Sequence, residues 1–88
     1  MVSKKIVISN KLGMHMRPAQ KFVKLATASG CNVEVVHKGC VIDAKSIMNL
    51  LAACIKCGDE IEVRCTGDGE AQALEELSQL AASGFGEA

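Results

Sequence analysis

The sequence predicts an α+β fold in which three helices cover one face of a four-stranded antiparallel sheet. Segments with alternating apolar residues, typical of strands, are interspersed with segments whose apolar residues recur at i, i+3, i+4 and i+7, typical of helices. The resulting order is β-α-β-β-α-β-α, and each helix is amphipathic on one side only. Helices of this kind gather on one face of a sheet. Because no linker or repeat interrupts the 88 residues, we expect residues 1–88 to form a single domain.

The first strand and the first helix are joined by a glycine-containing loop. Residues 4–9 alternate, which places Ile6 and Ile8 on the same face of a strand. Helical spacing then predicts a helix over residues 16–28, with its apolar side formed by Ala19, Phe22, Val23 and Ala26. Gly30 ends this helix, because glycine tolerates the left-handed conformation that follows a last turn.

A hairpin and the second helix come next. Residues 32–37 and 40–42 are predicted to be strands joined by a tight turn. Ser46 directly precedes another set with helical spacing, which comprises Ile47, Leu50, Leu51 and Cys54. Serine is among the best N-cap residues, so we expect the second helix to begin there and to stop at Gly58.

The last strand and the third helix complete the chain. Residues 60–66 alternate, with the inward positions Ile61, Val63 and Cys65. The chain turns at residues 67–69, where Asp68 is the expected cap of the third helix. The core face of that helix is predicted to be Leu74, Leu77 and Ala81, and Gly84 closes it.

Composition argues against several classes of function. Lys plus Arg and Asp plus Glu number 10 each, so no net field attracts nucleic acid or an anionic membrane. Two Phe and no Tyr or Trp leave little for base stacking. No apolar run approaches the roughly 20 residues of a membrane span, and the charged first five residues do not resemble a signal peptide. We therefore expect a soluble cytoplasmic protein that binds neither nucleic acid nor membrane.

Five cysteines raise the question of a disulfide framework or a zinc site. The odd number and the absence of an export signal argue against disulfides. Cys54 and Cys57 have CxxC spacing, but a structural zinc site needs a second pair of ligands, so we expect no metal. The cysteines are interpreted as buried or half-buried thiols that pack like small hydrophobic residues. A thiol-based redox or zinc-binding module centred on Cys54 and Cys57 is the alternative.

Residues 13–19, Gly-Met-His-Met-Arg-Pro-Ala, place a histidine at the start of the first helix. Pro18 belongs in a first turn, so His15 lies at the positive end of the helix, where anions bind. Arg17 adds a permanent cation shaped for phosphate oxygens, in a place that is electrostatically unfavourable for a cation without an anionic ligand. The pattern predicts a phosphate site, and by itself it is compatible with binding an anion or with phosphorylation of His15.

This segment resembles the active-site signature of HPr, the histidine-containing phosphocarrier family of the bacterial sugar phosphotransferase system. Three further segments are similar to the family: residues 43–48 around a regulatory serine, residues 56–61 at the turn into the last strand, and residues 83–85 near the end. Residues 10–15 look closest to the nitrogen-related branch, whereas the serine segment looks like the sugar branch, so the branch stays open. The resemblance implies an open-faced sandwich with strand order 1-4-2-3.

The resemblance also implies a function. His15 would accept a phosphoryl group through Nδ1 from a phosphorylated enzyme I-type donor and pass it to enzyme IIA-type acceptors, with Arg17 stabilising the phosphate. Such a carrier is a substrate of its partners and is not itself an enzyme. It would require no cofactor, and we expect it to be a monomer.

Two further roles follow from the resemblance. Ser46, besides its structural role as an N-cap, would be phosphorylated by an HPr kinase/phosphorylase in some bacteria, which makes a regulatory paralogue acting through Ser46 another alternative. Partners would dock on residues of the first two helices, namely Met16, Gln20, Lys24, Ile47, Met48 and Leu51. Met16 replaces the small alanine usual in the family and would influence the choice of partner. His37, in a hairpin, is interpreted as an ordinary surface residue.

Overall fold

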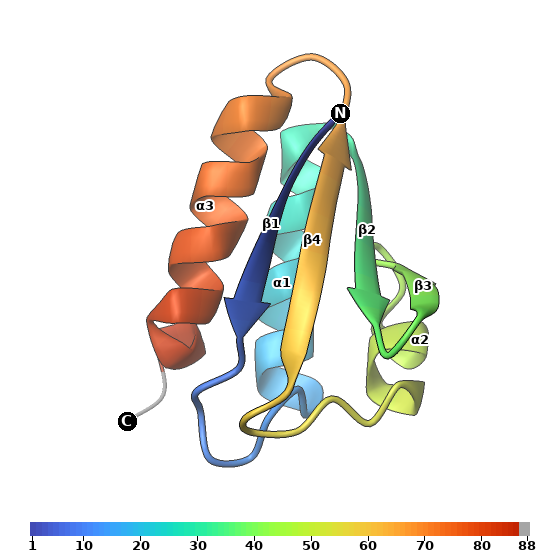
Figure 1. The fold of residues 1–88 in the computed structure, drawn as a ribbon. Helices are drawn as coiled ribbons and strands as arrows, with labels where there is room; N and C mark the ends of the chain where they lie inside the picture. Colours follow the sequence, from blue (N-terminus) through green and yellow to red (C-terminus); the bar gives the residue numbers. More distant parts are fainter. Residues whose placement is uncertain (87–88) are drawn as a thin grey trace.

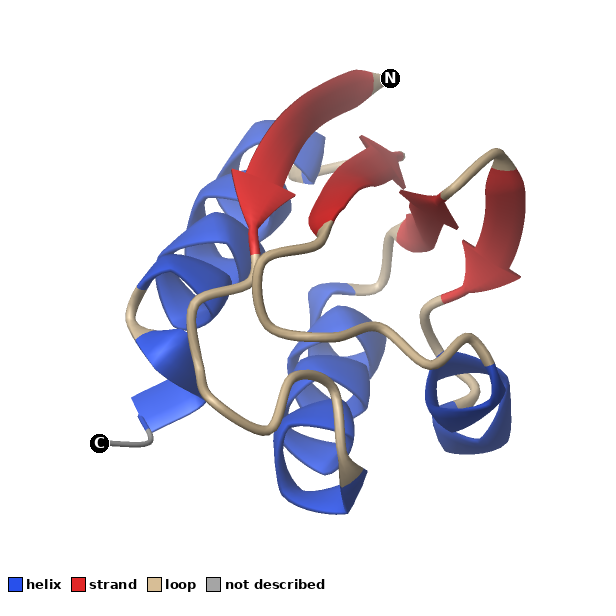
Figure 2. Ribbon diagram, turned by 60° about the horizontal axis from the view of Figure 1, so that its bottom comes forward, coloured by secondary structure: helices blue, strands red, loops and turns tan. Residues whose placement is uncertain are grey.

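The computed structural model describes residues 1–86, in which the helices cover one face of a four-stranded antiparallel sheet (Figures 1 and 2). The elements in chain order are β1 (Val2–Val7), α1 (Met16–Ser29), β2 (Asn32–His37), β3 (Cys40–Asp43), α2 (Ile47–Ala52), β4 (Glu60–Thr66), α3 (Glu70–Ala82) and a 3-10 turn, η1 (Gly84–Gly86). The strand order is β1-β4-β2-β3. The predicted fold class and strand order are therefore confirmed.

The core lies between the sheet and the helices. In the sheet, Ile6 pairs with Ile61 and Val35 with Val63, so the inward side chains of the three longer strands form a continuous apolar layer. The helices close this layer, because α3 packs against β1 and β4 while α2 packs against β3. The largest fully buried side chains include Phe22, Phe85, Ile8, Leu50, Ile61 and Leu77. The rings of Phe22 and Phe85 meet edge-on, with centroids 6.5 Å apart, and join α1 to η1.

The first strand ends earlier than predicted. β1 stops at Val7, yet Ile8 is completely buried, as its alternation with Ile6 predicts. The Ile8 N–H donates to the Asp59 carbonyl (2.9 Å), and its carbonyl accepts the Gly58 N–H (2.7 Å). α1 begins at Met16 and ends against Gly30, whose φ of 72° is the left-handed conformation expected there.

The second helix is shorter than predicted. Ser46 is its N-cap, and the Ser46 Oγ accepts the Asn49 N–H at 3.2 Å. The helix ends at Ala52, because Cys54 adopts a left-handed φ of 53° that turns the chain back toward β1. The prediction that Cys54 extends the buried stripe is wrong, since Cys54 is exposed and Ile55 is buried instead.

The third helix also starts differently. Gly69 is the N-cap of α3, so the prediction that Asp68 caps the helix is wrong. Asp68 precedes the cap, and its carbonyl accepts the Cys31 thiol at 3.1 Å. Leu77 and Ala81 are buried as predicted, whereas Leu74 is only partly buried. Within residues 1–86 no helix has the length and apolar character needed to span a bilayer.

Candidate functional site

His15 is the N-cap residue of α1. The start of this helix lies at the end of the molecule where the loop after β1 meets the segment before β4 (Figure 1). Its backbone is extended, with φ −95° and ψ −171°, and its carbonyl accepts the Ala19 N–H at 3.0 Å as the first bond of the helix. The side chain is half-buried. This placement is the one predicted from the position of Pro18, which is the third residue of α1.

The first turn of α1 is suited to an anion. The N–H groups of Met16 and Arg17 point out of the helix start, where the helix offers them no carbonyl, and Pro18 has no N–H. The turn contains no acidic residue, and the Arg17 side chain is exposed. Backbone donors and the positive end of the helix dipole therefore lie beside His15, and Arg17 adds a positively charged residue to the same turn.

The loop that presents His15 is held by hydrogen bonds on both sides of Gly13. The Gly13 N–H donates to the Asn10 carbonyl (3.0 Å), and the Gly13 carbonyl accepts the Asn10 Nδ2 (2.7 Å). The same carbonyl accepts the His15 N–H at 3.0 Å. Met14 is buried, and its N–H donates to the Ile55 carbonyl at 2.9 Å. The backbone around His15 is thereby tied to a segment distant in the sequence.

Gly13 is required by two features of its surroundings. Its φ of 65° is left-handed, which favours glycine. A Cβ at this position would lie 2.5 Å from the Ile55 carbonyl oxygen and 2.8 Å from the Lys56 Cα, distances that side chains do not tolerate. The loop predicted between the first strand and the first helix therefore needs its glycine for two reasons, the left-handed φ and the close contact with the segment before β4.

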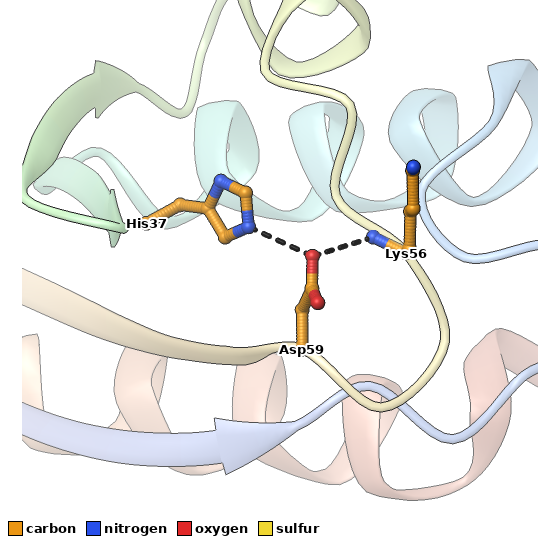
Figure 3. Close-up of polar contacts among 3 residues, drawn as sticks. All are labelled: His37, Lys56 and Asp59. Carbon is orange, nitrogen blue, oxygen red and sulfur yellow. Dashed lines mark hydrogen bonds and ion pairs between the residues drawn. The ribbon is translucent and has the colours of Figure 1, made fainter.

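That segment is itself organised by Asp59 (Figure 3). The Asp59 Oδ2 accepts the Lys56 N–H at 3.0 Å and lies 2.9 Å from the His37 Nε2. The Lys56 N–H and the His37 ring lower the pKa of Asp59 below its usual range, and desolvation only partly opposes them. The carboxylate therefore joins the end of β2 to the turn that supports the His15 loop.

His37 is buried, contrary to the prediction from the sequence. Only 5% of it is exposed, so the interpretation as an ordinary surface residue is incorrect. The missed signal is the alternation of β2, in which position 37 follows Val33 and Val35 on the inward face. A histidine in that phase needs a polar partner inside the fold, and Asp59 supplies one.

The six residues predicted to meet partners all lie on α1 or α2, which pack against each other. Met16 and Met48 are exposed by 50% and 73%, and Gln20 and Lys24 are also exposed. Ile47 and Leu51 are half-buried against the core. Leu12, in the loop before His15, is 74% exposed and was not predicted, although an apolar residue inside a polar loop is a visible signal.

The cysteines fall into two groups. Cys31 and Cys65 are buried as predicted, and burial raises the pKa of the Cys65 thiol. Cys40, Cys54 and Cys57 are exposed, so for these three the prediction of buried or half-buried thiols is wrong. All five are free thiols. Within residues 1–86 the His, Cys, Asp and Glu side chains form no group of three or more that could hold a metal ion.

Comparison with known proteins identifies relatives along the whole fold. A family model described as "PTS HPr component phosphorylation site" matches residues 2–83. The phosphocarrier protein HPr of Xylella fastidiosa strain 9a5c is 33% identical over 87 residues, covering 99% of this chain and 98% of that protein. The crystal structure of HPr-C-His from Thermoanaerobacter tengcongensis is 34% identical, with a TM-score of 0.95 over 100% of this chain and 99% of the other.

A third similar structure is the catabolite repression containing protein Crh of Bacillus subtilis, described as a dimer with a swapping domain. It is 32% identical with a TM-score of 0.76 and covers 96% of this chain and 97% of that one. The matched residues of all three comparisons include the loop before α1 and the segment that supports it.

Proposed function

Because this chain belongs to the HPr family of phosphocarrier proteins of the phosphotransferase system, we propose that His15 is its phosphoryl acceptor. An enzyme I-type donor supplies the phosphoryl group, and enzyme IIA-type proteins receive it. The observation that carries this proposal is the position of His15 as N-cap of α1, beside the N–H groups of Met16 and Arg17.

The chemistry requires a nucleophile and a site for the transferred charge. A ring nitrogen of neutral His15, which we assign as Nδ1, attacks the phosphorus atom while the bond between phosphorus and the donor breaks. The transferred group keeps its negative oxygens, which the positive end of α1 and the Arg17 guanidinium stabilise. Because the resulting P–N bond is labile, the same geometry allows the group to leave for the next acceptor.

Docking of both partners is assigned to the surface formed by α1 and α2. Exposed apolar side chains are typical of interaction sites. Met16 follows His15 directly, and Met48 is exposed on α2, which packs against α1. Gln20 and Lys24 extend the same side of α1, one and two turns beyond Met16. Ile47 and Leu51 contribute their exposed edges.

Phosphorylation of Ser46 is a regulatory function that one observation favours. The Ser46 Oγ already faces the start of α2, where it accepts the Asn49 N–H. A phosphate at this position would be tolerated by the helix start and would place negative charge next to Ile47 and Met48 in the docking surface. Its effect would therefore be on partner binding and not on folding.

Incubation with phosphoenolpyruvate and a bacterial enzyme I tests the proposal. The expected product carries one phosphoryl group, stable in base and labile in acid, on His15. The matched control is His37→Gln, because His37 is the only other histidine of the chain and is buried. We expect no labelling of His15→Ala and full labelling of His37→Gln at long times. Full labelling of His15→Ala would refute the assignment.

A further inference from the structure

The turn before β4 is closed by a reciprocal pair of hydrogen bonds. The Lys56 N–H donates to the Asp59 Oδ2 (3.0 Å), and the Asp59 N–H donates to the Lys56 carbonyl (3.0 Å). The same carboxylate oxygen lies 2.9 Å from the His37 Nε2. Figure 3 shows how Asp59 stands between the histidine on β2 and the backbone of the turn. A single side chain thus determines both the shape of the turn and its attachment to the sheet.

This turn supports the His15 loop at its entry and at its exit. At the entry, Ile8 bonds to the backbone of both Gly58 and Asp59. At the exit, the Met14 N–H bonds to the Ile55 carbonyl, and Gly13 packs directly on the backbone of Ile55 and Lys56. A change in the turn therefore reaches Met14 through one hydrogen bond, and Met14 is the neighbour of His15.

The His37 ring depends on Asp59 for its position. A cavity of about 560 Å³ opens beside it and is lined by Ile42, Ala53, Cys54 and Lys56, among others. The buried imidazole needs a polar partner, and the bond from its Nε2 to the Asp59 carboxylate supplies that partner and orients the ring. Hydrogen bonds to an ionised carboxylate are roughly twice as strong as neutral ones, which suits the pair to this task.

We propose that His37 and Asp59 form a positioning pair that holds the His15 loop in the geometry required for phosphoryl transfer. The proposal rests on the proposed function of His15. Neither residue touches the phosphoryl group, and both act through the turn and through Met14. Misplacing a reacting group by about 1 Å can slow a reaction on the order of 100-fold, so even a small relaxation of the loop is measurable.

Single-turnover transfer from phosphorylated enzyme I tests the pair. The transfer rate is measured by rapid quench at increasing concentrations of this protein. The dependence gives two quantities, the transfer rate at saturation and the protein concentration at which the rate is half of that value. For Asp59→Ala we expect the saturating rate to fall by about tenfold, with the half-saturating concentration unchanged because the docking surface is intact. Asp59→Asn should restore much of the rate, since its amide oxygen can still accept the Lys56 N–H.

His37→Phe should slow transfer less than Asp59→Ala, because the turn keeps its Lys56 bond. If the two residues act as a unit, the double variant is no slower than Asp59→Ala alone. The matched control is Glu62→Ala. Glu62 lies on β4, the strand that follows Asp59, and its hydrogen bond with Arg64 likewise lowers its pKa, but it is on the outer face of the sheet. We expect this control to transfer at the rate of the unmodified protein.

Amide hydrogen exchange gives a readout that does not depend on activity. In Asp59→Ala the Met14 amide should exchange faster, while the Val63 amide in the centre of β4 stays protected. If Asp59→Ala fails to fold, Asp59→Asn and His37→Phe serve for the same comparison.

Two results would overturn the positioning role: an unchanged saturating rate in a folded Asp59→Ala variant, or an equal loss in Glu62→Ala. Failure of the unmodified protein to accept phosphate at His15 would instead refute the proposed function, and this inference with it. The two failures are therefore distinguishable.

Discussion

Replacing Gly13 by alanine tests how the His15 loop is held against its supporting turn. The added Cβ would meet the Ile55 carbonyl oxygen at 2.5 Å and the Lys56 Cα at 2.8 Å. Both are backbone atoms, so neither can rotate away as the end of a flexible side chain would. Position 13 also has a φ of 65°, which an alanine adopts at a cost of about 1–2 kcal/mol. The variant therefore carries a conformational penalty and a steric one.

Gly39→Ala isolates the conformational penalty. Gly39 has a φ of 81°, and its added Cβ would have nothing within 4 Å. We expect this control to lower the free energy of unfolding by about 1 kcal/mol. At Gly13 the turn must also shift, or the bond between Met14 and Ile55 must break, which adds about 1–3 kcal/mol. Gly13→Ala should therefore lower the free energy of unfolding by about 2–5 kcal/mol in total.

Urea denaturation measures the free energy of unfolding of each variant. Thermal melting provides a check, because the melting temperature of a domain of this size falls by about 4–8 °C for each kcal/mol of stability lost. Whatever fraction of Gly13→Ala is folded should also accept phosphate from enzyme I slowly, whereas Gly39→Ala should accept it normally. Equal destabilisation by the two substitutions would show that the close contact with Ile55 and Lys56 is absent in solution, and the reasoning would fail.

Three further substitutions have defined outcomes. Met48→Asp should weaken binding to enzyme I, measured by calorimetry, by about 1–3 kcal/mol. The free energy of unfolding should change by only about 0.5 kcal/mol, because Met48 is 73% exposed. Unchanged affinity would show that Met48 is not part of the docking surface. Cys54→Gly should raise the free energy of unfolding by about 0.5–1 kcal/mol, and with it the melting temperature, because the φ of 53° at this position favours glycine. Phosphoryl transfer should stay intact. Lost transfer in the folded variant would support the thiol alternative. The folded-state pKa of Asp59 is lowered, so its carboxylate contributes stability above the unfolded pKa of about 4, and that contribution is lost as pH falls through the folded pKa. The stability difference between the unmodified protein and Asp59→Asn should therefore narrow on acidification below about pH 4, and a constant difference would contradict this.

Local patterns predicted those elements whose ends are set by nearby residues. Ser46 caps α2 because its own side chain reaches the Asn49 N–H, and Gly30 ends α1 through its own φ. β2 has its predicted bounds because alternation there coincides with burial. The site follows the same rule, because Pro18 and the helical spacing after it place His15 at the start of α1.

The errors occur where distant residues decide the local structure. Helical spacing predicts that α2 continues through Cys54, but the chain must turn back to pair Gly58 with Ile8, and a cysteine in a left-handed conformation gives no sequence signal for that turn. The contact between His37 and Asp59 joins two elements that only the sheet topology brings together. The alternation of β2 places His37 on the inward face, but the sequence does not show which residue becomes its polar partner.

The residues next to His15 in the sequence determine the chemistry of the site, whereas residues distant in the sequence help to determine its geometry. Ordering each residue of the loop before His15 costs about 1–2 kcal/mol of backbone entropy, and its bonds between Asn10 and Gly13 offset only part of that cost. The segment before β4 contributes further stabilisation, through the hydrogen bond between the Met14 N–H and the Ile55 carbonyl. Because the turn in that segment is shaped by Asp59, a substitution at this carboxylate should affect phosphoryl transfer more than removal of an exposed side chain that is closer to His15 in the sequence. Leu12, which is 74% exposed in the loop itself, provides the comparison. The saturating transfer rate of Asp59→Ala should be lower than that of Leu12→Ala, and the reverse order would contradict the role of the turn.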